Sequence, residues 1–178
     1  MYYKIILNAF FITFIFILQL SFVSDLSWWF SMLNIILISL IFILVYFGFK
    51  ITAFWSLGFG FLLDVYSFNY YGLYILSLFL TLLLVNFILV NFITNRSLYS
   101  FLVLIIVSLL CFQIILHSLA YFFSFFNEKY LAVFFKEFFW FNIVKQILIN
   151  SALTVFIFYT FSFISNRFKP VFLIREKK

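Results

Sequence analysis

The chain is poor in charge, glycine, proline and cysteine, and each shortage narrows what it can be. Only 9% of its 178 residues are charged, whereas 68% are hydrophobic. Soluble domains carry about 25% charged residues, so this chain has too little polar material to cover a water-facing surface. We therefore predict an all-α, polytopic membrane protein.

The residues needed for several kinds of chemistry are also missing. A single cysteine, Cys111, excludes a disulfide framework or a cysteine metal site within one chain. The sequence has no G-x-S-x-G, no H-E-x-x-H, no P-loop and no glycine-rich dinucleotide turn. Its only aspartates are Asp25 and Asp64, so an intramembrane aspartate pair cannot form. We predict no enzymatic activity, no cofactor and no metal site. The net charge of +6 is dispersed around apolar runs and does not indicate nucleic-acid binding.

Six apolar runs follow one another along the chain, and a membrane-spanning helix needs about 20 apolar residues. They predict one transmembrane domain, residues 1–178, with spans at about 5–23, 32–49, 51–65, 74–93, 98–123 and 143–164 and a basic tail at 165–178. The first run is longer than the usual signal-peptide core of about 7–15 residues and no cleavage site follows, so we expect an uncleaved span. The segment at 124–142 is expected to be an interfacial helix, a re-entrant piece or a plain loop.

Most basic residues fall on one side of a six-span arrangement. Two lysines, Lys129 and Lys136, lie on the other side. The larger group would share the side of both termini and contains Lys4, Lys50, Arg96, Arg167, Lys169, Arg175, Lys177 and Lys178. This bias predicts that both termini are cytoplasmic. Three indoles, at positions 28, 29 and 140, would then lie at the outer interface, where tryptophan is enriched.

Asp64 is the most informative polar residue, because almost everything around it is apolar. A charged side chain in hydrocarbon costs between about 2.5 and more than 10 kcal/mol, so it needs a partner, water or a task. Gly58 and Gly60 precede it and Gly72 follows it. The first two glycines are two residues apart and do not form a small-xxx-small face, so they indicate close helix packing or a local break.

Depth along the predicted spans places several polar residues near the outer side. At 1.5 Å per residue, Asp64 would lie in the outer third of the hydrocarbon. His117, Lys145 and Gln146 would lie at similar depth, and Asn150 two turns deeper. We predict that Asp64, His117, Lys145 and Gln146 form one outward-facing cluster, with Lys145 or His117 as the partner of Asp64. Three alternatives stay open: Lys145 snorkels to headgroups, His117 donates to a carbonyl, and interfacial water satisfies Asp64.

Four stretches of sequence carry a family resemblance that covers nearly the whole chain. They are Gly60-Phe-Leu-Leu-Asp64 followed by Tyr71-Gly72-Leu73-Tyr74, the pair Trp28-Trp29, the triplet Thr94-Asn95-Arg96, and Phe139-Trp140 with Asn150 and Ile157 to Phe168. In layout, length and span number the chain resembles the MreD family of the bacterial rod-shape system. It departs from relatives that often carry proline in the region of Ser31 to Asn34, and His or Arg at the position of Tyr74.

The resemblance implies a non-enzymatic component of the cell-elongation machinery in the bacterial cytoplasmic membrane. Its implied partners are MreC first, then MreB, RodA and a class B penicillin-binding protein, together with membrane lipids. The family is similar in architecture to the substrate-binding components of energy-coupling-factor transporters, so a vitamin-binding function is the alternative. Those components typically carry A-x-x-x-A in the first helix, where this chain has only Ala9. A lipid-interacting scaffold is a third interpretation.

Overall fold

The computed structural model describes residues 2–23, 30–67, 70–93, 97–124 and 138–172, and every regular element in these ranges is a helix. This confirms the all-α prediction. The elements, in chain order, are α1 (Tyr2–Ile17), the π-helical turn η1 (Leu18–Val23), the 3-10 turn η2 (Phe30–Met32), α2 (Ile35–Phe47), α3 (Phe49–Ser67), α4 (Leu73–Phe92), α5 (Leu98–Ser124) and α6 (Phe138–Phe172).

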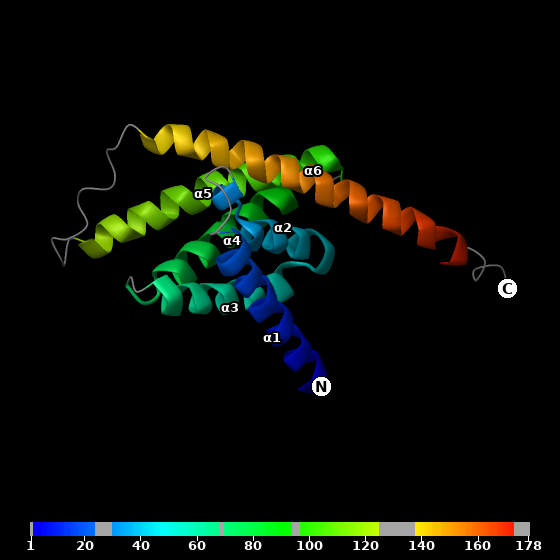
Figure 1. Cartoon of the computed structure of the whole chain (residues 1–178), viewed down its shortest axis with the longest axis horizontal. Coiled ribbons are helices and arrows are strands. Elements are labelled where there is room, and N and C mark those ends of the chain that lie inside the picture. The colour runs from blue at the N-terminus through cyan, green and yellow to red at the C-terminus, as the bar shows by residue number, and fades with distance from the viewer. Residues whose placement is uncertain (1, 24–29, 68–69, 94–96, 125–137, 173–178) are drawn as a thin grey trace.

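The helices pack mainly against their neighbours in the chain. α3 packs against α4, α4 against α5, and α5 against α6, while α2 contacts both α3 and α5. α1 packs on α3. In Figure 1, α6 lies along one side of the bundle and α1 projects from the other. α3 and α5 therefore each contact three other helices, and α2 lies between them.

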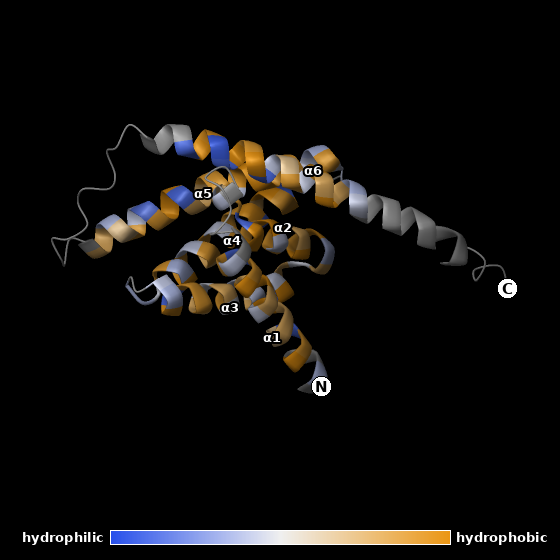
Figure 2. Ribbon diagram, viewed as in Figure 1, coloured by the Kyte–Doolittle hydropathy of each residue, from blue (hydrophilic) through white to orange (hydrophobic). Residues whose placement is uncertain are grey.

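Within the described ranges, three helices are long and apolar enough to cross a membrane: Leu73–Phe92, Leu98–Phe123 and Asn142–Thr160. The stretches Ile6–Ser21 and Ile35–Phe47 are apolar but shorter. Large apolar side chains are exposed on all the long helices. Most of the ribbon of α1 to α5 is orange in Figure 2, the colour of hydrophobic residues. Soluble monomers rarely expose so much contiguous apolar surface, and these helices therefore suit a hydrocarbon environment.

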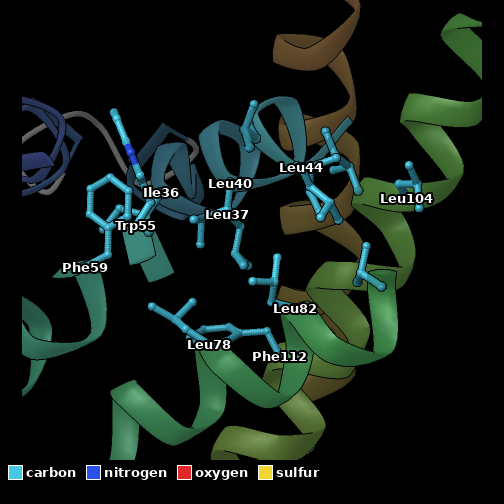
Figure 3. Close-up of a cluster of buried hydrophobic side chains, with 14 of the residues drawn as sticks. Ile36, Leu37, Leu40, Leu44, Trp55, Phe59, Leu78, Leu82, Leu104 and Phe112 are labelled. Carbon is cyan, nitrogen blue, oxygen red and sulfur yellow. The ribbon is translucent and has the colours of Figure 1, made fainter. Parts of the chain in front are cut away.

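The core forms where one face of α2 meets α3, α4 and α5. Leu40 and Leu44 on α2 are 2% exposed, and Leu78 on α4 is 1% exposed. Figure 3 shows these side chains together with Phe59 of α3 and Leu104 of α5. α2 is apolar all round, which is typical of a helix that is enclosed by other helices or by lipid.

Local residues explain where α2 begins and ends. The Asn34 side chain accepts a hydrogen bond from the backbone N–H of Leu37 at 3.0 Å, which caps the helix start. At the other end Gly48 has φ of 82°, a left-handed conformation that few other residues adopt, and α3 begins at the next residue. α2 and α3 are thus joined by one residue.

Each of the six predicted runs overlaps one α-helix of the described ranges, but the boundaries differ. The run at 5–23 covers most of α1 together with the π-helical turn η1. The run at 32–49 begins with the end of a 3-10 turn, and its α-helix covers only Ile35–Phe47. The run at 143–164 lies within a longer helix, Phe138–Phe172, which extends into the predicted tail. Trp28, Trp29 and most of the segment at 124–142 lie outside the described residues, and the count of six membrane spans remains a prediction.

Candidate functional site

Asp64 is buried near the end of α3 and binds the beginning of α4. Its side chain is 2% exposed. Oδ1 accepts the backbone N–H of Tyr74 at 2.8 Å, and Oδ2 accepts those of Gly72 at 3.0 Å and Ile75 at 3.2 Å. The first N–H groups of a helix have no acceptor within it, so Asp64 supplies the cap that α4 lacks. The partial positive charge of a helix start also favours a carboxylate there.

Gly72 makes this cap necessary and geometrically feasible. It is the N-cap residue of α4, it has φ of 92°, and it has no side chain to accept a hydrogen bond. Ser, Thr, Asp or Asn usually serves at this position. Here the acceptor comes from a residue eight positions earlier in the chain. The Gly72 conformation turns the chain so that α4 runs back along α3.

Gly60 lets the two helices approach closely. A Cβ atom at this position would lie 2.5 Å from Cα of Ile75, which is closer than real Cβ atoms come to any neighbour. Gly60 and Asp64 are four residues apart and therefore share one face of α3. On that face, Gly60 provides the close contact to α4 and Asp64 caps its first turn.

Gly58 faces a different helix. A Cβ atom there would lie 3.1 Å from Cδ1 of Ile12 on α1. α3 is continuous through both glycines, so they serve close packing, one toward α1 and one toward α4, and they do not break the helix. Of the two interpretations left open by the sequence, close packing is the one the structure supports.

The predicted partners of Asp64 were wrong. We expected Lys145 or His117, but the carboxylate is satisfied by three backbone N–H groups of one turn. An N-terminal helix turn presents several N–H groups that have no acceptor within the helix, and here three of them meet the carboxylate. Lys145 lies on α6 and His117 on α5, and both side chains are half-buried.

Gln146 belongs to a separate contact between α5 and α6. Its Oε1 atom accepts a hydrogen bond from Nε2 of Gln113 at 3.0 Å. The polar residues of both helices appear as blue segments in Figure 2, in the stretches of α5 and α6 away from the chain's C-terminus. The predicted cluster is therefore divided: Asp64 holds α4, and Gln146 joins α6 to α5.

Asn150 connects parts of the sequence that are 116 residues or more apart. It is completely buried. Its Oδ1 atom accepts the backbone N–H of Asn34 at 2.8 Å, and its Nδ2 group donates to the carbonyls of Met32 at 3.1 Å and Gln146 at 2.7 Å. Thr154, one turn further, donates to the carbonyl of Asn150. Asn150 therefore fastens α6 to the start of α2.

Gln19 also binds the start of α2, and the sequence did not lead us to predict this contact. Its Nε2 group donates to the carbonyl of Leu33 at 2.9 Å, and its Oε1 atom accepts the N–H of Ile35 at 2.7 Å. Gln19 lies in the π-helical turn η1, and no pattern in the surrounding apolar sequence indicates that it makes these hydrogen bonds. Asn34 was also missed, although an asparagine directly before an apolar run is a recognised helix-start signal.

These contacts hold helices together. In each of them, a side-chain carboxylate or amide on one element makes hydrogen bonds to backbone groups or to another amide on a second element. Within the described residues, no three His, Cys, Asp or Glu side chains gather where they could hold a metal ion. Comparison with protein-family models, with curated proteins and with solved structures finds no match for this chain.

Proposed function

We propose that this chain is a six-span protein of the bacterial cytoplasmic membrane that serves cell elongation without catalysing a reaction, as the resemblance to the MreD family implies. The observation that carries the proposal is the contact between Asp64 and the start of α4. The two halves of the motif behind the resemblance, Gly60 to Asp64 and Gly72 to Tyr74, meet in this contact. A motif whose halves meet supports a shared architecture better than scattered residues do.

The proposed role is to hold partner proteins in the membrane. Three polar side chains, the buried Asp64 and Asn150 and the half-buried Gln19, are engaged in joining helices. Apolar helix faces and connecting segments then remain for contact with MreC, which would link the chain to peptidoglycan synthases. MreB, RodA and a class B penicillin-binding protein would join the same assembly.

The membrane topology can be tested with single cysteines. Cys111 is the only natural cysteine, and replacing it with serine leaves an unreactive background. Tyr71 and Ser97 are both exposed, and they lie at opposite ends of α4. In intact cells a membrane-impermeant maleimide should label Tyr71→Cys and not Ser97→Cys, whereas both should react after the cells are opened. Labelling of Ser97→Cys in intact cells would refute the proposed orientation.

The function itself is tested by gentle isolation of the tagged chain from native membranes of a rod-shaped host. We expect MreC to co-purify and depletion of the chain to make the cells round. A matched isolation of an unrelated polytopic protein controls for carry-over of membrane fragments. Recovery of the ATPase core of an energy-coupling-factor transporter with a bound vitamin, and no MreC, would favour the alternative function and reject this one.

A further inference from the structure

The side of α2 that faces away from the core lines a groove. It has a volume of about 330 Å³. Ser39, Phe42 and Tyr46 of α2 form its floor, Ile15 of α1 and Ile157 of α6 flank it, and Trp55 of α3 also contributes. No charged side chain lines it, and its smallest side chain is that of Ser39, in the middle of α2.

The groove extends along the whole of α2, from Ile35 to Phe47. Twelve helical steps of 1.5 Å give it a length of about 18 Å. One leaflet of a bilayer has a hydrocarbon depth of about 15 Å, half of the full core. The groove is therefore about as long as one extended acyl chain of a membrane lipid.

The volume favours a slender occupant. A helix with the same length of about 18 Å and a diameter of about 10–12 Å takes up about 1,400 Å³ or more, several times the groove volume of about 330 Å³. A single hydrocarbon chain is slender enough to lie within the groove, whereas a partner helix would remain mostly outside it.

The two ends of the groove differ in charge. Beyond Phe47, Lys50 is exposed on the first turn of α3. Asp64 is the only acidic residue in the described ranges, and it is engaged at α4, so Lys50 has no acidic partner there. At the other end, near Ile35, the polar groups are the neutral amides of Gln19 and Asn34, both of which make hydrogen bonds.

We infer that this groove holds one acyl chain of an anionic phospholipid whose headgroup lies at Lys50. The inference rests on the membrane placement proposed above, and it assigns to the general expectation of lipid contact one site, one acyl chain and a headgroup charge. The hydrocarbon chain would cover the apolar floor on α2 and contact α1 and α6 together. The bound lipid would thus help to join the two outer helices, and Lys50 would select its charge.

Native mass spectrometry of the purified, delipidated protein tests this. Phosphatidylglycerol or phosphatidylcholine is added at equal concentration, and the fraction of protein that retains one lipid is measured. Ser39→Phe fills the groove and should abolish tight retention of phosphatidylglycerol. Leu84→Phe adds the same ring on the exposed face of α4, outside the groove, and should retain lipid as the wild type does. Equal retention by the wild type and Ser39→Phe would overturn the inference.

Charge selection is tested separately. A basic side chain at the membrane surface contributes about 1 kcal/mol toward an anionic lipid, which corresponds to about fivefold in affinity. Lys50→Gln should lower the preference for phosphatidylglycerol over phosphatidylcholine by about this factor. An unchanged preference would reject the placement of the headgroup.

A photoreactive benzophenone side chain at position 39 gives a third test. Its positive result is a new covalent adduct, whereas the first two tests measure a loss of binding or of preference. In native membranes we expect a phospholipid adduct on the chain, and a cross-link to a protein helix in its place would overturn the inference. The two mass-spectrometry assays use the purified protein alone. Failure of MreC to co-purify would therefore leave them unaffected, and loss of lipid binding would not alter the test of the proposed function.

Discussion

Replacing Asp64 with asparagine should destabilise the α3–α4 pair by an amount that follows from its three hydrogen bonds. The best orientation keeps the amide oxygen at the position of Oδ2, where it still accepts from Gly72 and Ile75. The NH₂ group then faces the N–H of Tyr74, which loses its acceptor. Leaving one buried donor unsatisfied costs about 1–3 kcal/mol.

Two further effects act on the same substitution. The two remaining hydrogen bonds become neutral, which weakens each by about 1 kcal/mol. Against this, asparagine is easier to bury than a charged carboxylate, and that offsets part of the loss. We therefore expect Asp64→Asn to lower the free energy of unfolding by about 2–4 kcal/mol.

The assay is unfolding in mixed micelles by added dodecyl sulfate, followed by circular dichroism, together with amide hydrogen exchange. The N–H groups of Gly72, Tyr74 and Ile75 should exchange faster in Asp64→Asn than in the wild type. Val65→Ala is the matched control, because Val65 is adjacent and half-exposed. If Asp64→Asn keeps the wild-type unfolding midpoint and the wild-type exchange at these three amides, the capping argument is refuted.

The other contacts predict distinct outcomes. Gly60→Ala should lower the free energy of unfolding by about 1–3 kcal/mol in the same assay, because the added Cβ would meet the backbone of Ile75. Gly58→Ala should lower it by less, because the added Cβ would meet the end of the flexible Ile12 side chain. A larger loss for Gly58→Ala than for Gly60→Ala would contradict the helix packing described above. Asn150→Ala leaves a buried backbone N–H without an acceptor and should cost about 1–3 kcal/mol, with faster amide exchange at the start of α2. A double-mutant cycle on Gln113 and Gln146 should give a coupling energy of about 0.6 kcal/mol, and a value of zero would argue against their hydrogen bond.

The positions of the helices could be predicted because apolar runs alternate with short polar breaks. The runs at 74–93 and 98–123 differ from α4 and α5 by one residue at most at each end. Asn34 and Gly48 explain why α2 is shorter than its apolar run. Both residues lie within the run at 32–49, and hydropathy alone does not separate a cap residue from the helix it ends.

The importance of Asp64 was predictable, and its partner was not. The depth argument compared side chains only, and for that reason it named Lys145 and His117. It left out the backbone at the start of the next helix. The signal was present in Gly72, since a helix that begins after glycine lacks a capping side chain of its own. Gln19 had no comparable signal, because its position depends on the π-helical turn that contains it.

The π-helical turn η1 determines how well the end of α1 tolerates insertions and deletions. Each residue rotates an α-helix by about 100° about its axis, whereas a π-helical turn takes up more residues for the same rotation. Deleting Leu18 would therefore swing the Gln19 amide by about 100°, away from Leu33 and Ile35, without altering hydropathy. The number of residues between Ile17 and Val23 thus matters more than which apolar residues accompany Gln19. In this stretch, insertions and deletions should be more damaging than substitutions of one apolar residue for another.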